Sequence, residues 1–171
     1  MNQNYFDLLI DNGIKIDCSV TPHKSWEMSP GFLPNSKGSD YTYHPEKPYT
    51  VKHSSHGATL LEIPVTVRNM RYIPGKPFHL KSIKSAILRK TIWLRPDGKN
   101  LQDMIALINK IKRSPPDDYL MFMLHSSELM PGGSPTFKTA GAIEKLYRDL
   151  SSLFEYISKD FEGITLKDYA L

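Results

Sequence analysis

Apolar residues recur at helical spacing in several parts of the chain. Over 101–112 they fall every three or four positions, and Asn100 stands where an N-cap residue is expected. The same spacing runs from 143 to 157, with Thr139 as the expected cap. Both segments are therefore predicted to be helices. Two shorter helical patterns complete the set: residues 5–12, which stop before Gly13, and residues 80–90.

Four stretches are predicted to be strands because they are rich in β-branched residues or are apolar without a break. They are 14–20, 59–67, 119–124 and 164–166. Pro64 lies inside the second stretch, and since proline has no backbone N–H, it predicts a bulge or an edge position there. The alternation of helices and strands predicts an α/β fold with a mostly parallel sheet and helices packed against it.

Residues 21–58 are predicted to form one long loop. They contain many prolines and glycines, and also aromatic residues such as Trp26. Aromatic content argues against disorder, and loops of this length in compact domains are usually functional. We therefore expect an ordered loop at the rim formed by the carboxyl ends of the strands, where active sites of such folds lie.

Length and composition indicate a single domain covering 1–171. The chain is 40% hydrophobic and 23% charged, which is ordinary for a globular protein. It contains no apolar run of about 20 residues that could span a membrane, and its N-terminus does not resemble a signal peptide. Cytoplasmic location is the default expectation. The single cysteine, Cys18, excludes an intrachain disulfide.

The net charge of +4 mildly favours an anionic partner. Nucleic-acid-binding proteins usually combine such charge with stacking aromatic residues or a recognisable module, and the sequence contains neither. We therefore expect no nucleic-acid partner. A nucleic-acid-binding domain stays a competing interpretation, which affinity falling steeply with salt would support.

His125 is the leading candidate for chemistry. It follows the apolar stretch 119–124 directly, so in a parallel sheet it would emerge at the rim that receives the long loop. The unperturbed pKa of histidine suits general acid or base catalysis near neutral pH. Alternatively, His125 caps the following turn. Glu128, three residues later, either orients the histidine or is solvated.

Other polar residues suggest weaker possibilities. Asp17 lies in an apolar strand and needs a partner, either a backbone amide or a histidine on the same rim. His53 and His56 have a His-x-x-His spacing, with Asp40 or Glu62 as a possible third metal ligand. Because these histidines lie among serines and a glycine, the spacing is weak evidence, and we predict no metal ligand in this chain.

Several stretches together resemble a known family. They are "IKIDCSVTP", "GSDYTYHPEKPY", "TLLEIPVT", "WLRPDG" and above all "FMLHSSELMPGGSPTF". In this order they resemble the second half of polysaccharide deacetylases, metal-dependent carbohydrate esterases with a distorted β/α barrel. The resemblance implies that the chain is the C-terminal part of such a domain, a partial (β/α) barrel with helices outside.

The resemblance also implies roles for individual residues. His125 matches the histidine that acts as general acid toward the departing amine. Leu124 matches a leucine that lines the acetyl pocket, and Trp26 matches a tryptophan that walls the substrate groove. Asp17 lies in the region of an acidic residue that helps set the pKa of the histidine.

The chain departs from the family in its missing metal and base motifs. A "T-F-D-D" type motif, an "H-[ST]-x-x-H" motif and an "R-x-P-x-G" motif would precede the region seen here, and "HSSH" has the wrong spacing. The complete family domain uses a divalent metal such as zinc to activate water. We therefore expect that this chain binds no metal alone, and that it deacetylates no N-acetylated glycan by itself.

Two further expectations follow from the missing motifs. An opened barrel exposes a strand edge, which favours a homodimer or a complex with a separately encoded N-terminal half. The main competing function is a non-catalytic carbohydrate- or partner-binding module that has kept the groove.

Overall fold

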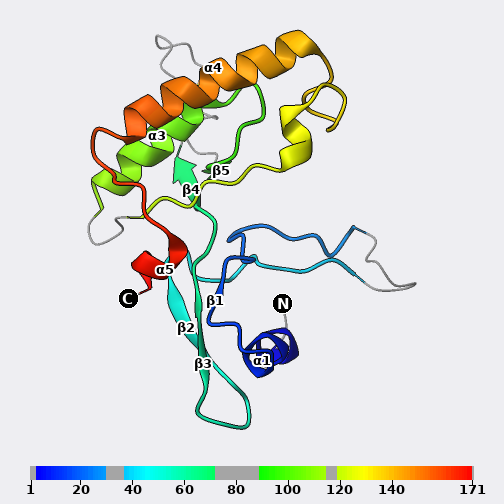
Figure 1. Cartoon of the computed structure of the whole chain (residues 1–171), viewed down its shortest axis with the longest axis vertical. Coiled ribbons are helices and arrows are strands. Elements are labelled where there is room, and N and C mark those ends of the chain that lie inside the picture. Colours follow the sequence, from blue (N-terminus) through cyan, green and yellow to red (C-terminus); the bar gives the residue numbers. More distant parts are fainter. Residues whose placement is uncertain (1–2, 30–36, 72–88, 115–118, 171) are drawn as a thin grey trace. The chain divides into compact units, whose positions relative to one another are not determined.

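The computed structural model describes residues 3–29, 37–71, 89–114 and 119–170, and it divides into two compact units. The first unit contains Met1–Val67 and Ile164–Leu171, and the second contains Arg68–Gly163. Figure 1 shows the helices and strands of each unit. None of the described helices is long and apolar enough to cross a membrane.

The first unit is built around a small mixed sheet of three strands. β3 (Thr59–Glu62) lies in the centre, parallel to β1 (Ile16–Asp17) and antiparallel to β2 (Tyr49–Lys52). In the parallel pair Asp17 lies opposite Glu62. Helix α1 (Gln3–Asp11) packs beside β3, and the short α5 (Leu166–Tyr169) also belongs to this unit.

The core of the first unit joins α1 to the sheet and to the long connection after β1. Its buried apolar side chains are those of Phe6, Ile10, Val20, Tyr41, Val51 and Leu60. Burial of aromatic and branched side chains of this kind contributes about 1.5–3 kcal/mol each. Within the described part of this connection, Tyr41 is buried in the core and Trp26 packs against it.

The second unit packs two helices against a two-stranded antiparallel sheet. The strands are β4 (Val67–Arg71) and β5 (Arg89–Trp93). Helix α3 (Leu101–Lys112) contacts β5 and lies along helix α4 (Ala140–Ile157), as Figure 1 shows. Between the helices a single 3₁₀ turn covers Ser126–Leu129.

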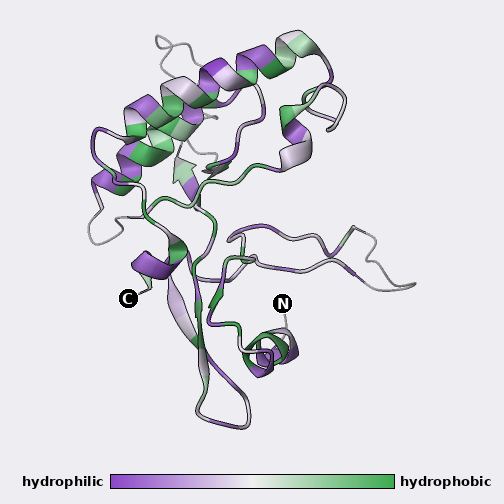
Figure 2. Ribbon diagram, in the orientation of Figure 1, coloured by the Kyte–Doolittle hydropathy of each residue, from purple (hydrophilic) through white to green (hydrophobic). Residues whose placement is uncertain are grey.

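Two apolar clusters hold the second unit together. The larger contains Ile92, Leu94, Met104, Leu107, Ile108, Ile111 and Leu153. The smaller contains Phe137, Ile143 and Leu146. In Figure 2 hydrophobic and hydrophilic bands alternate along α4, as expected for a helix with one buried face.

The helix predictions are largely confirmed. α3 has the predicted bounds, with Asn100 in the N-cap position, although its side chain bonds Asp97 and Arg95 rather than the helix. α4 begins after Thr139, whose hydroxyl accepts the N–H of Ala142 at 3.2 Å. α1 ends near the predicted place, and Gly13 has a positive φ of 76°. The pattern at 80–90 lies mostly outside the described residues.

The predicted partial barrel is wrong. The described residues form two small sheets, and of their strand pairings only β1–β3 is parallel. The order of elements suggested a parallel sheet, but order along the chain does not decide which strands share hydrogen bonds. A tight turn brings β2 and β3 together as a hairpin, with the N–H of His53 donating to the carbonyl of Ala58 at 2.9 Å.

Several strand bounds also differ from the prediction. Regular pairing of 14–20 is limited to Ile16–Asp17, although backbone hydrogen bonds to the β3 segment continue to Val20. The predicted strand 59–67 breaks into β3 and β4 around Pro64, which has no N–H to donate. The predicted loop 21–58 contains β2.

The last two predicted strands are not formed. Residues 119–124 are extended but make no strand; their apolar side chains pack into the larger cluster, and the N–H of Met123 donates to the carbonyl of Leu94. Residues 164–166 lead into α5, because Thr165 caps that helix through the N–H of Asp168.

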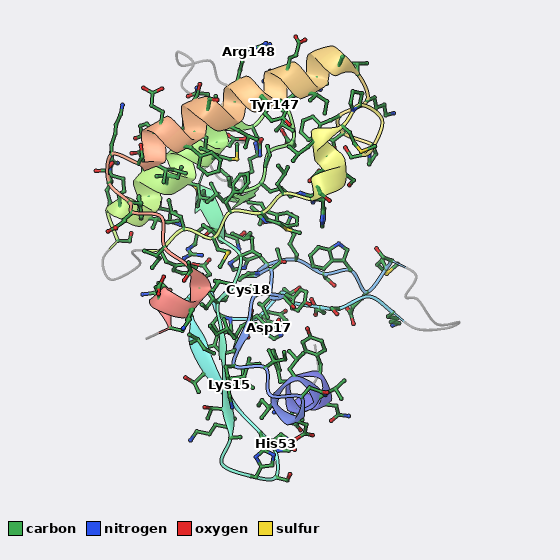
Figure 3. The ribbon with its side chains drawn as sticks, in the orientation of Figure 1. Lys15, Asp17, Cys18, His53, Tyr147 and Arg148 are labelled. Atoms are coloured by element: carbon green, nitrogen blue, oxygen red, sulfur yellow. The ribbon has the colours of Figure 1, made fainter. Side chains whose placement is uncertain are left out.

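Neighbouring residues on α4 provide a test of the packing. Leu146 is 0% exposed and Tyr147 is 51% exposed, and Figure 3 labels Tyr147 on this helix. Because Leu146→Ala leaves a cavity, it should lower the free energy of unfolding by about 2–5 kcal/mol. Tyr147→Ala should change it by less than about 1 kcal/mol. Urea denaturation followed by circular dichroism measures both, and equal losses would contradict the described packing.

Candidate functional site

His125 lies at the start of the 3₁₀ turn, not at the end of a strand. Its backbone is extended, and its side chain is exposed. The N–H of Glu128 donates to the carbonyl of His125 at 2.9 Å, and the N–H of His125 donates to Oε2 of Glu128 at 3.0 Å. This reciprocal pair has the form of a capping box. The backbone of His125 is therefore fixed while its imidazole faces solvent.

Glu128 is the buried anchor of this turn. Only 2% of the residue is exposed, and its Oε1 lies 2.9 Å from a guanidinium nitrogen of Arg95. The guanidinium of Arg95 also lies over the ring of Trp93, 5.0 Å from its centroid. The pair joins two stretches that the sequence singles out separately, "WLRPDG" and "HSSEL". The sequence left the role of Glu128 open, and the structure makes it an internal charge partner.

Residues on both sides of His125 differ in exposure. Leu124 is partly buried, whereas Leu129 and Met130 are exposed large apolar residues. The loop that follows turns back at Gly132, which has a φ of 75° and donates its N–H to the carbonyl of Phe137. An exposed imidazole beside exposed apolar side chains is a plausible contact surface for an external ligand.

Asp17 and Glu62 form a carboxyl pair in the first unit. They are register partners in β1 and β3, and a hydrogen bond joins their side chains. Asp17 also accepts a hydrogen bond from the hydroxyl of Ser19 at 2.8 Å, and Ser19 contacts the Tyr5 hydroxyl. The partner of Asp17 is thus neither a histidine nor a backbone amide, the two possibilities that the sequence suggested.

Burial favours the protonated form of Glu62. Glu62 is 0% exposed, and desolvation raises its pKa from 4.5 to about 8, with the charge and hydrogen bond of Asp17 adding to the rise. A hydrogen bond from the N–H of Val20 opposes the shift. Desolvation raises the pKa of the Cys18 thiol to about 11, and the nearby charges of Glu62 and Asp17 contribute to the rise. Cys18 is therefore not an activated nucleophile.

Trp26 is mainly a packing residue of the first unit. Its ring meets that of Tyr41 edge to face, with centroids 5.8 Å apart, and it borders the apolar core. The backbone N–H of Trp26 donates to the carbonyl of Ser39. A Cβ atom at Gly38 would lie only 2.2 Å from the carbonyl oxygen of Trp26, so a larger residue would clash there. The predicted contact of Trp26 with a substrate stays a prediction.

A third group of polar residues joins the β2–β3 turn to the end of α1. Nε2 of His53 and Nε2 of His56 lie 3.2 and 3.4 Å from Oδ1 of Asp11. The two imidazole rings are stacked, with centroids 3.6 Å apart. The described residues contain one group with ligand atoms close enough for a metal ion, and it consists of these three side chains. Figure 3 shows His53 at the turn, beside α1.

The sequence identified the two histidines but missed Asp11. It suggested Asp40 or Glu62 as a third ligand, but Asp40 accepts hydrogen bonds from Thr42 and Glu62 is buried beside Asp17. Asp11 is more than 40 residues from His53 along the chain, at the last position of α1. No local spacing could reveal this contact, because it depends on how α1 packs beside the hairpin.

The predicted site residues therefore fall into two separate groups. Leu124 and His125 belong to the second unit, and Asp17 and Trp26 belong to the first. Comparison of the chain with protein-family models, curated proteins and solved structures finds no match. The resemblance to polysaccharide deacetylases stays a hypothesis that rests on the motifs.

The pair of Arg95 and Glu128 should make a measurable contribution to the stability of the second unit. Glu128→Ala leaves a partly buried guanidinium without its partner, which should lower the free energy of unfolding by about 3 kcal/mol. Asp160→Ala is the matched control, because it breaks the more exposed pair of Lys112 and Asp160 and should cost less than about 1 kcal/mol. Urea denaturation of both variants measures the difference, and a negligible loss for Glu128→Ala would refute the anchor role.

The raised pKa of Glu62 predicts a stability that depends on pH. Between about pH 4.5 and pH 8 the unfolded carboxyl loses its proton while the folded one keeps it. The free energy of unfolding should therefore fall as pH rises, by up to about 1.4 kcal/mol for each pH unit in that window.

Glu62→Gln removes this titration and keeps the shape of the side chain. Denaturation midpoints across the window should therefore be flatter for the variant than for the unaltered protein. Parallel profiles would show that Glu62 is ionised in the folded state.

Proposed function

We propose that this chain carries the leaving-group side of a glycan N-deacetylation site, with His125 as the proton donor. The observation that supports the proposal best is the setting of His125. The residue is exposed, and the buried carboxylate of Glu128, paired with the partly buried Arg95, fixes its backbone. A general acid requires a rigid support and an imidazole that a substrate can reach.

The reaction assigned to His125 is one proton transfer. When water adds to the acetyl carbonyl and the C–N bond breaks, the nitrogen leaves as an amine and needs a proton. The imidazolium of His125 donates that proton, and acetate is the other product. Leu124, Leu129 and Met130 would offer apolar contact to the acetyl group or the sugar face.

The chain is not proposed to complete the reaction alone. Metal would polarise the carbonyl and ready the water in the full family site. Among the described residues, however, His125 belongs to no group of potential metal ligands. The described fold is also not a barrel. A second half, encoded separately, would have to supply the base and the metal ligands under this proposal.

An N-acetylated oligosaccharide tests the proposal. Adding it to the isotope-labelled protein should shift the NMR signals of the His125 ring and the Leu124 methyl groups with saturation, and should release no acetate. His125→Ala should weaken binding, whereas His23→Asn, in the other unit, should not. Absence of any saturable shift would refute the proposal.

Two other outcomes would change it. Metal-dependent acetate release by the purified chain would contradict the view that it lacks part of the site. Binding that survives both a chelator and His125→Ala unchanged would instead indicate a non-catalytic carbohydrate-binding module.

A further inference from the structure

Hydrogen bonds other than those of His53 and His56 also hold the turn between β2 and β3 against α1. The N–H and hydroxyl of Ser54 donate to the carboxylate of Asp7, at 3.1 and 2.5 Å. The side chain of Gln3 donates both to Asp7 and to the carbonyl of Lys52. These bonds, from the first residue and the middle of α1, hold the helix against the turn without involving the histidines. Asp11, His53 and His56 are therefore held close together before any ion binds.

The Nε2 atom of His53 is buried next to the Asp11 carboxylate. The His53 side chain is 7% exposed, and its Nε2 is buried without a hydrogen bond to any described residue. This nitrogen nevertheless lies 3.2 Å from the Asp11 carboxylate. A buried polar atom without a partner is unfavourable, and in native proteins it often marks a bound ion or water. His56 brings a second imidazole to the same carboxylate oxygen.

The position of Asp11 also favours a cation. It is the last residue of α1, where the helix dipole is negative, and the last turn of α1 contains no basic residue. A carboxylate there is unfavourable unless a positive charge neutralises it. Two imidazoles and one carboxylate are a typical ligand set for zinc, with water in the fourth position. Such nitrogen-rich sets favour zinc, nickel or copper over magnesium and calcium.

We propose that Asp11, His53 and His56 bind a zinc ion, or another transition-metal ion with the same ligand preference. This metal site joins the β2–β3 turn to the end of α1. This inference does not depend on the proposed function of His125.

One ring must turn when the ion binds. Metal bonds lie in the plane of an imidazole, and the two rings are stacked only 8° from parallel, so one ion cannot lie in both planes. His56 is the ring that turns, because 48% of its side chain is exposed. It gives up the hydrogen bond from the N–H of Ala58 to its Nδ1, the 3.4 Å hydrogen bond between its Nε2 and Asp11, and the stacking on His53. These losses are small compared with the free energy of zinc binding.

Ser55 provides the outer support for His53. Nδ1 of His53 lies 3.1 Å from the N–H of Ser55 and 3.2 Å from its hydroxyl oxygen. When Nε2 binds the metal, the ring proton moves to Nδ1. Nδ1 then no longer accepts the backbone N–H of Ser55, and it donates a hydrogen bond to the Ser55 hydroxyl oxygen instead. Outer hydrogen bonds of this kind orient histidine ligands and raise their affinity.

Calorimetric titration of the full chain with zinc chloride, after removal of any histidine tag, tests the site. We expect one ion per chain, and no competition from magnesium. His53→Ala and His56→Ala should each weaken binding at least about 100-fold, and Ser55→Ala about 10-fold. His23→Asn is the matched control, because His23 pairs with Glu46 in the same unit and has a positive φ that asparagine tolerates.

Two results would overturn the proposal: zinc binding that is unchanged in the His53→Ala, His56→Ala double variant, or no saturable binding by the unaltered chain. A measurement on the unaltered protein keeps the test valid even if the variants fail to fold. Cobalt added to the unaltered protein should give a visible spectrum typical of tetrahedral coordination, and zinc should abolish it. Zinc should also raise the melting temperature of the unaltered chain and leave that of a folded double variant unchanged.

Discussion

A glutamate carboxyl group removed from water must either hold a proton or meet a positive charge, and each unit of this protein is organised around one such group. Glu62 in the first unit and Glu128 in the second are both buried. An ionised carboxylate left alone in either position would cost several kcal/mol. The residues around each glutamate must therefore either favour its protonated form or neutralise its charge, and the two units do this in different ways.

The first unit keeps Glu62 protonated. Among the described residues, the groups that shift the pKa of Glu62 are another acid, Asp17, and the backbone N–H of Val20, and neither is a cation. The parallel register of β1 and β3 places the two acids opposite each other, and Asp17 adds to the rise in the pKa of Glu62. The second unit neutralises Glu128 with Arg95, and the pair then fixes the turn that presents His125. Burial of a glutamate thus leads to a protonated Glu62 in the first unit. In the second unit it leads to an ion pair that supports the exposed imidazole of His125.

The candidate sites show which functional residues could be identified from local sequence patterns. The motif around His125 was visible in the sequence, but the partner of Glu128 was not, because Arg95 lies 33 residues earlier. The spacing of His53 and His56 is visible too, but in a loop such a spacing is weak evidence for a metal site. Asp11 completes that group only because Asp7 and Ser54 hold the turn against α1. In both cases the missing residue comes from a distant segment, which no spacing rule reaches.

The sequence by itself determined most of α1, α3 and α4. Helical hydrogen bonds join residues four apart, so apolar spacing and a capping residue such as Thr139 contain most of the necessary information. The tertiary structure alone decided the sheets and the charge partners. A strand has no internal hydrogen bonds, so its bounds and direction depend on which segment lies beside it. For this reason 119–124 is apolar and extended without pairing as a strand, and the alternation that predicted a barrel produced two small sheets instead.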